Sequence, residues 1–191
     1  LLEGVASSVS MLLYLDNADS IAVHPNENYA RELMELHTMG RDAYFGKNPG
    51  GADVSAQGFT DDDIIQAARA FSGWTLKQGQ YGANGQRIAD TGEFFFHDVA
   101  HNASAGLCLG FDLSSVSEKG LAQGRKVLDL VASHPATATF IATKICRRIF
   151  GDAPPPAVIT RAAAAFTSNR DRPDQLKQVL RAILLDGPEI S

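Results

Sequence analysis

The fold is decided by the stretch Asn26-Glu27-Asn28-Tyr29-Ala30-Arg31-Glu32-Leu33-Met34-Glu35-Leu36-His37-Thr38-Met39-Gly40. Most of its residues are good helix formers, so it predicts one α-helix that follows the N-cap residue Asn26 and ends at Gly40. At about 100° per residue, Tyr29, Leu33 and Leu36 fall on one face and make it apolar. We therefore expect an amphipathic helix that packs this face into a core and turns a strongly charged face away from it.

The charged face of this helix allows three interpretations. In the first, its side chains line a polar functional site. In the second, the face is solvated, and its ion pairs are worth only about 0.2–0.5 kcal/mol each. In the third, the face belongs to a hydrogen-bond network buried between helices, because buried polar groups must be paired. The members of that network would be Asn26, Asn28, Arg31, Glu32 and Arg69.

The composition is that of an ordinary globular protein. The chain has 191 residues, of which 45% are hydrophobic and 20% charged. Its formal net charge of −5 argues against a surface for nucleic acid or anionic membranes. No apolar run approaches the roughly 20 residues that cross a bilayer. Cys108 and Cys146 make no zinc motif and are equally compatible with one disulfide or two buried thiols. No phosphate cradle is present, and no cofactor is predicted.

The periodicity of the remaining chain predicts a mainly α fold, a multi-helix globular bundle that forms a single domain over residues 1–191. Two long loops interrupt the helices, one over residues 41–58 and the other over residues 75–118. The second loop carries an aromatic run and predicts a small β-hairpin or an extended aromatic segment. Between the two loops, Thr60 and Asp63 predict a capping box at the start of a helix.

Two histidines in the second loop, His97 and His101, are four residues apart and lie near Asp98. Such a pair can share a metal on one face of a helix, but the neighbouring glycine, asparagine and serine residues argue against a helix here. No H-E-x-x-H sequence or set of thiolates accompanies them. The sequence therefore predicts no metal and favours histidines that anchor the loop by hydrogen bonds. A metal site formed by His97, Asp98 and His101 is the alternative.

Several motifs together resemble the bacterial family known as domain of unknown function 1800. The stretch 26–40 resembles the signature of that family. A second motif is matched by Thr60, Asp63 and the run Ala67-Ala68-Arg69-Ala70-Phe71-Ser72-Gly73-Trp74. The resemblance covers nearly the whole chain. It implies a mainly helical protein that is the C-terminal portion of a longer chain, of bacterial origin and exported or periplasmic.

The later motifs of the family are matched more loosely. The family usually has a His-Asp pair, and His101-Asn102 stands at the corresponding place unless His97-Asp98 is the true counterpart. The family usually has a lysine shortly afterwards, where this chain has Gly106. The resemblance implies no reaction, cofactor or substrate.

The sequence is therefore compatible with two functions. The first is a binding or assembly module of an exported system, with a protein partner and no nucleic acid. Its candidate binding residues are Asn28, Arg31, Arg69 and Trp74. The second is a hydrolase-like or carbohydrate-active enzyme that uses a cluster of Glu, Arg and His side chains. Its candidate catalytic residues are Glu32, Glu35 and His101. One helical turn gives the shorter end of the roughly 5–9.5 Å that separates the carboxylates of glycosidases.

Overall fold

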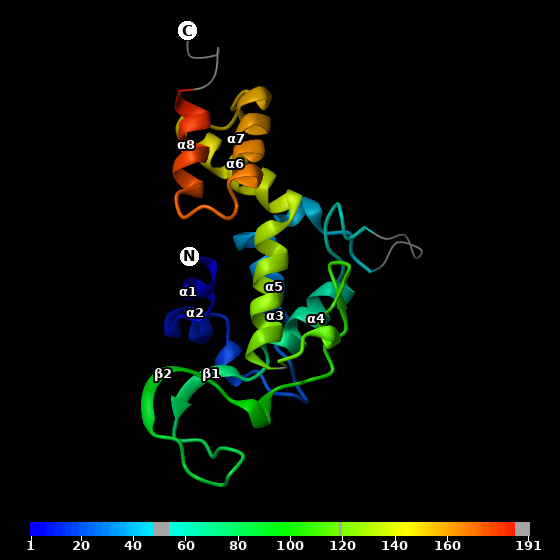
Figure 1. Ribbon diagram of the computed structural model, residues 1–191, viewed down its shortest axis with the longest axis vertical. Helices are drawn as coiled ribbons and strands as arrows, with labels where there is room; N and C mark the ends of the chain where they lie inside the picture. Colours follow the sequence, from blue (N-terminus) through cyan, green and yellow to red (C-terminus); the bar gives the residue numbers. More distant parts are fainter. Residues whose placement is uncertain (48–53, 119, 186–191) are drawn as a thin grey trace.

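The computed structural model describes residues 1–47, 54–118 and 120–185, and these residues are mainly helical with a small β-hairpin, as predicted (Figure 1). The hairpin pairs β1 (Trp74–Gln78) with β2 (Asp90–Phe96) in antiparallel orientation. A second short antiparallel pair, β3 (Leu107–Cys108) and β4 (Phe111–Asp112), follows it. No helix within the described ranges combines the length and the apolar character needed to cross a bilayer.

The first two thirds of the chain form what we call the body, which contains the hairpin and several α-helices. These helices are α1 (Leu2–Ala6), α2 (Val9–Tyr14), α3 (Glu27–Glu32), α4 (Asp61–Phe71) and α5 (Leu121–Ser133). Short 3-10 turns connect them: η1 (Asn17–Asp19), η3 (Arg41–Ala43), η4 (Asp98–Ala100) and η5 (Leu113–Ser115). Part of the predicted loop 41–58, residues 48–53, lies outside the described residues.

The core of the body is aromatic. Tyr29 packs edge-on against Phe71, with ring centroids 5.3 Å apart, and Phe71 packs edge-on against Trp74 at 5.2 Å. Trp74 has no exposed surface. A Cβ atom on Gly124 of α5 would lie 2.7 Å from the Trp74 ring, so the glycine lets the helix lie directly on the indole. The aromatic cluster thus joins α3, α4, α5 and the hairpin.

The predicted helix over 26–40 is correct at its start and wrong at its end. The side chain of Asn26 accepts a hydrogen bond from Tyr29 N–H, as an N-cap does, but α3 ends at Glu32 and continues as the π-helix η2 (Leu33–His37). A π-helix bonds i to i+5, so each residue turns through a smaller angle than the 100° assumed. Leu36, predicted to be buried, is therefore 50% exposed, whereas Glu35 is only 6% exposed.

The predicted capping box at the start of α4 is confirmed. Thr60 Oγ1 accepts a hydrogen bond from Asp63 N–H, and Asp63 Oδ2 accepts the Thr60 N–H at 2.8 Å. The other oxygen of Asp63, Oδ1, accepts the N–H of Leu109 at 2.6 Å. The same carboxylate therefore starts the helix and holds the turn between β3 and β4 against it.

The last third of the chain forms a three-helix unit with an apolar core of its own. Its helices are α6 (Pro135–Phe150), α7 (Pro156–Ser168) and α8 (Gln175–Leu184), and each packs on the next (Figure 1). Their core contains Ala142, Cys146, Val158 and Val179, and no member of it belongs to the core of the body. His134 is both the last cap of α5 and the N-cap of α6, so the unit follows the body without a loop.

Candidate functional site

The charged face of α3 lies in a cluster of ion pairs rather than on an open wall. Arg31 donates from Nη1 to Glu35 Oε1 at 3.4 Å and from Nη2 to Asp61 Oδ1 at 3.2 Å. Tyr44 O–H donates to the same Asp61 oxygen at 2.6 Å, and its ring lies 5.4 Å from the guanidinium carbon of Arg31. Arg41 Nε donates to the second oxygen of Glu35 at 3.4 Å. Both carboxylates are therefore already occupied by partners from the protein.

The electrostatics of this cluster favour the fully charged state. The hydroxyl of Tyr44, and after it the guanidinium of Arg31, lowers the pKa of the Asp61 carboxyl below its ordinary value. The contacts with Tyr44, Asp61 and Glu35 raise the pKa of Arg31. The pairs join the start of α4 to α3 and η2, with Glu35 buried and Arg31 one-third exposed. Such a cluster stabilises the contact between two helices and offers no vacant acid or base.

The other residues predicted for a site on this face are scattered. Asn28 is exposed and Glu32 is half-buried, and neither reaches Asp61 or Arg69 through a hydrogen bond between described residues. Arg69 donates from Nη1 to Gln66 Oε1 at 3.3 Å and to the Ser104 carbonyl at 3.4 Å, away from the Arg31 cluster. Trp74 is enclosed in the core. The predicted network of five residues is therefore at least two separate sets, one around Arg31 and one around Arg69.

The histidines of the second loop make hydrogen bonds within the protein. His97 Nε2 lies 2.9 Å from the carbonyl oxygen of Tyr81. His101 lies between two oxygens, with Nδ1 2.9 Å from Ser72 O and Nε2 2.8 Å from Gln123 Oε1. Across residues 1–47, 54–118 and 120–185, no three Asp, Glu, His or Cys side chains converge as metal ligands. The contacts of His97 and His101 are those of histidines that anchor a loop.

A cavity of about 410 Å³ lies between η1 and the hairpin, outside the predicted site. Its polar walls come from Asp19, Gln78 and His97, and its aromatic wall comes from Tyr81, which is 65% exposed. Gly73 forms part of the floor at φ +80°, and a Cβ there would lie 2.6 Å from the His97 carbonyl oxygen. Of the sequence-predicted residues, His97 alone lines this cavity.

A second, apolar cavity lies between α1, α2 and α3, and Leu33 and His37 are among its lining residues. Neither cavity is lined by Glu32, Glu35 or Arg31. Sequence reasoning did not find the cavity at the hairpin because its walls are far apart in the chain. The signals present in the sequence were a turn rich in glycine and glutamine around residues 78–82 and an isolated tyrosine.

Comparison with known families decides the identity of the chain. The model of the family described as "Protein of unknown function (DUF1800)" matches residues 1–190. The chain belongs to this family. No curated protein and no solved structure matches it.

Membership of DUF1800 confirms the resemblance and leaves the chemistry open. At Gly106, where a lysine was expected, an added Cβ would meet Gln66 Oε1 at an ordinary 3.6 Å. Steric crowding at that backbone position therefore does not explain the glycine. The N–H of Gly106 donates to the same Gln66 oxygen at 2.7 Å, and that oxygen also accepts from Arg69. Arg69, a member of the second family motif, thus helps to hold this loop on α4.

Proposed function

We propose that this DUF1800 protein is a binding module that holds a neutral carbohydrate in the cavity between η1 and the hairpin. One observation carries the proposal: polar side chains and an exposed aromatic ring converge on a cavity of about 410 Å³. That volume falls within the range of small-molecule sites, which use a few placed polar groups beside apolar surface. As part of the same proposal, and on the basis of the family resemblance, the module works in an exported bacterial system.

The chemistry of the lining favours a ligand rich in hydroxyl groups. Within the described residues, the side chains of Asp19 and Gln78 have no hydrogen-bond partner in the protein, so both are available to a ligand. A carboxylate accepts hydroxyl protons, and an amide both donates and accepts. The ring of Tyr81 offers a flat apolar face for the C–H side of a sugar ring. No lysine or arginine lines the cavity, and the charge of Asp19 disfavours anions.

The enzyme alternative has less support from the geometry. A pair of glycosidase carboxylates needs one free nucleophile or base and one free acid, with a sugar between them. Both oxygens of Glu35 are engaged by arginines, and the side chain is 7% exposed. His101, the third candidate, has both ring nitrogens at hydrogen-bond distance from protein oxygens. The predictions of a protein partner and of no nucleic-acid binding stay predictions.

Titration calorimetry with soluble oligosaccharides of glucose and of N-acetylglucosamine tests the proposal. We expect at least one series to bind, and Tyr81→Ala to weaken it roughly tenfold, about 1.4 kcal/mol. Gln78→Ala should weaken it as well, because an amide hydrogen bond is lost. Tyr14→Ala is the matched control, since Tyr14 is 78% exposed on α2 and does not line the cavity. Binding that Tyr81→Ala and Gln78→Ala leave unchanged would contradict the proposal, as would no binding by either series.

A further inference from the structure

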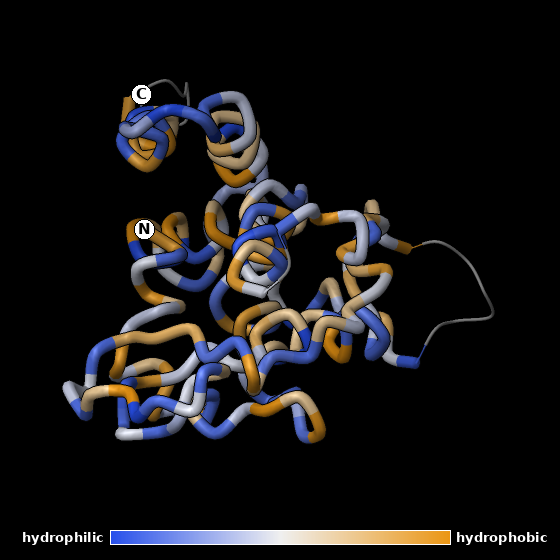
Figure 2. The backbone as a smooth tube through the Cα atoms, turned by 60° about the horizontal axis from the view of Figure 1, so that its bottom comes forward, coloured by the Kyte–Doolittle hydropathy of each residue, from blue (hydrophilic) through white to orange (hydrophobic). Residues whose placement is uncertain are grey.

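The three-helix unit differs from the body in what it leaves exposed. Along α8, Val179, Ala182 and Ile183 are buried, and Val179 and Ile183 belong to the core shared with α6 and α7. Beside that buried face, Leu176, Leu180 and Leu184 form a row at four-residue spacing. They are 40%, 42% and 46% exposed, and Leu185 after them is 71% exposed. The apolar surface of α8 therefore extends beyond its buried face to side chains in contact with solvent. In Figure 2, hydrophobic (orange) and hydrophilic (blue) segments alternate along these helices.

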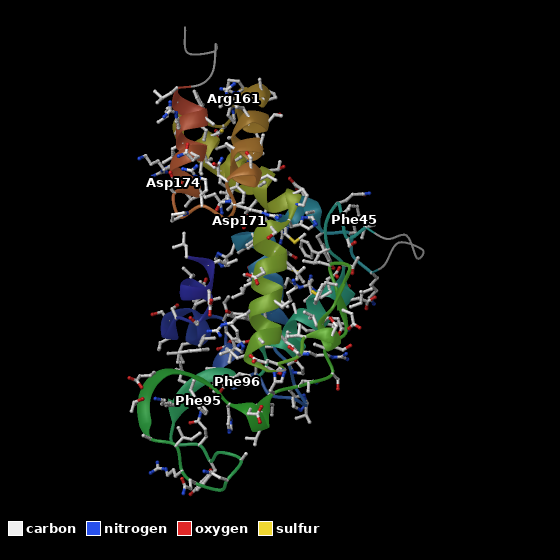
Figure 3. All side chains as sticks on the ribbon, viewed as in Figure 1. Phe45, Phe95, Phe96, Arg161, Asp171 and Asp174 are labelled. Atoms are coloured by element: carbon white, nitrogen blue, oxygen red, sulfur yellow. The ribbon has the colours of Figure 1, made fainter. Side chains whose placement is uncertain are left out.

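Basic side chains stand next to this leucine row. At 100° per residue, Lys177 and Arg181 follow Leu176 and Leu180 around the helix on the side away from the core. Going around α8, the buried face is therefore followed by the leucine row, and the leucine row by the two basic side chains. Arg161 of α7 donates from Nε to the Ala182 carbonyl at 2.9 Å and holds the two helices together near the upper end of the unit in Figure 3. This helix has an apolar edge bordered by positive charge.

The net charge of −5 conceals an unequal distribution along the chain. Residues 1–134 contain nine Lys and Arg against 17 Asp and Glu, a net charge of −8. Residues 135–191 contain eight against five, a net charge of +3. Because residues 135–191 are positive, the negative net charge of the whole chain does not disfavour contact between the three-helix unit and an anionic membrane surface. An anionic surface would attract this unit and repel the body, which would orient the molecule.

We propose that the leucine row of α8, with its neighbouring basic residues, docks on the surface of an anionic lipid bilayer. A helix that carries leucines on one side and Lys and Arg beside them is the type that lies in the membrane interface. The row runs from Leu176 to Leu184, which is nine residues and about 12 Å of helix. A few half-exposed leucines fall far short of the roughly 20–30 residues per side of a stable protein interface. They suit a reversible interfacial contact that depends on both apolar burial and charge.

The test is sedimentation of the full chain with large unilamellar vesicles at 50 mM salt. We expect binding to vesicles of 70% phosphatidylcholine and 30% phosphatidylglycerol. The partition coefficient should fall at least tenfold for vesicles of phosphatidylcholine alone, and at least tenfold in 500 mM salt. The double change Leu180→Ser with Leu184→Ser should also cost at least tenfold, as should Lys177→Glu. Because these positions are exposed on the helix, circular dichroism should report the same helix content in every variant.

The control variant changes two exposed leucines of the body, Leu13→Ser and Leu107→Ser, which are 52% and 63% exposed. It should bind vesicles as the wild type does. Equal binding by the α8 double variant and the wild type would overturn the proposal. Absence of vesicle binding would also overturn it. If sedimentation velocity then showed a dimer that the α8 double variant lacks, a second copy would be the occupant of the leucine row.

Discussion

The body and the three-helix unit are stabilised by different means. In the body, buried polar groups accompany an aromatic core, and the carboxylates of Glu35 and Asp63 each accept more than one hydrogen bond. In the unit, beyond residue 137, the described buried side chains are Ala, Val, Ile, Phe and Cys. The body uses directional bonds that fix how its elements meet, whereas the unit relies on the packing of amphipathic helices. The first arrangement suits a defined cavity, and the second leaves apolar surface available for docking.

The largest effect is expected from Trp74→Ala, which removes the centre of the aromatic core. Burial without any exposed surface, together with contacts to Phe71 and Phe94, predicts a loss of about 4 kcal/mol in the free energy of unfolding. Urea denaturation followed by circular dichroism measures it. Phe150→Ala, at a 40% exposed position of the unit, should stay within about 0.5 kcal/mol. Equal losses of unfolding free energy for the two variants would contradict the proposed difference in how the body and the three-helix unit are stabilised.

How much of this could be read from the sequence depends on the range of the interactions. The capping box of Thr60 and Asp63 is a pattern of four residues, and it was predicted correctly. The π-helix η2 was missed because the stretch carries ordinary helical residues, and η2 ends at His37, before the predicted stop at Gly40. Of the partners of Arg31, the sequence predicted Glu35, which is one helical turn away. It did not predict Asp61 and Tyr44, which come from elsewhere in the fold. No local sequence pattern predicts such long-range contacts.

Asp63→Ala comes next in size and tests the directional bonds of the body. It removes an acceptor for two backbone N–H groups and for Thr60 Oγ1, and it leaves the N–H of Leu109 without its partner. We expect a loss of about 3 kcal/mol, measured by urea denaturation with the fluorescence of Trp74. The neighbouring Asp62→Ala is the matched control, because Asp62 is exposed, and it should change stability by at most about 0.5 kcal/mol. Similar losses for both aspartates would mean that helix-dipole charge, not the hydrogen bonds, is responsible.

Arg31→Ala distinguishes a structural cluster from a site. Glu35 would keep Arg41 and Asp61 would keep Tyr44, so we expect a moderate loss of about 1.5 kcal/mol in the free energy of unfolding. Oligosaccharide binding at the hairpin cavity should stay within twofold. A fold of unchanged stability that has lost all binding would instead make Arg31 a ligand-contacting residue.

Tyr44→Phe gives the smallest effect and adds a dependence on pH. The lowered pKa of Asp61 in the folded state stabilises the protein above the ordinary carboxyl value of 3.8, and this contribution is lost as the pH falls through the lower folded value. Without the Tyr44 hydroxyl, we expect a loss of about 0.5–1.5 kcal/mol at pH 7. The difference from the wild type should shrink below about pH 4, as Asp61 becomes protonated. A difference that is the same at pH 7 and pH 3 would show that the hydroxyl acts elsewhere.

The two cysteines provide the most direct measurement of whether the regions are separate. Cys108 lies in the core of the body and Cys146 in the core of the unit, both without exposed surface, and burial raises the pKa of each thiol. Each thiol therefore reacts with a thiol reagent only when its own region opens. We expect Phe166→Ala to destabilise the core of the unit by about 3 kcal/mol. We predict that it speeds the labelling of Cys146 about 100-fold and leaves that of Cys108 within twofold. An equal acceleration of both thiols would contradict the account, because one cooperative unit would then contain both cores.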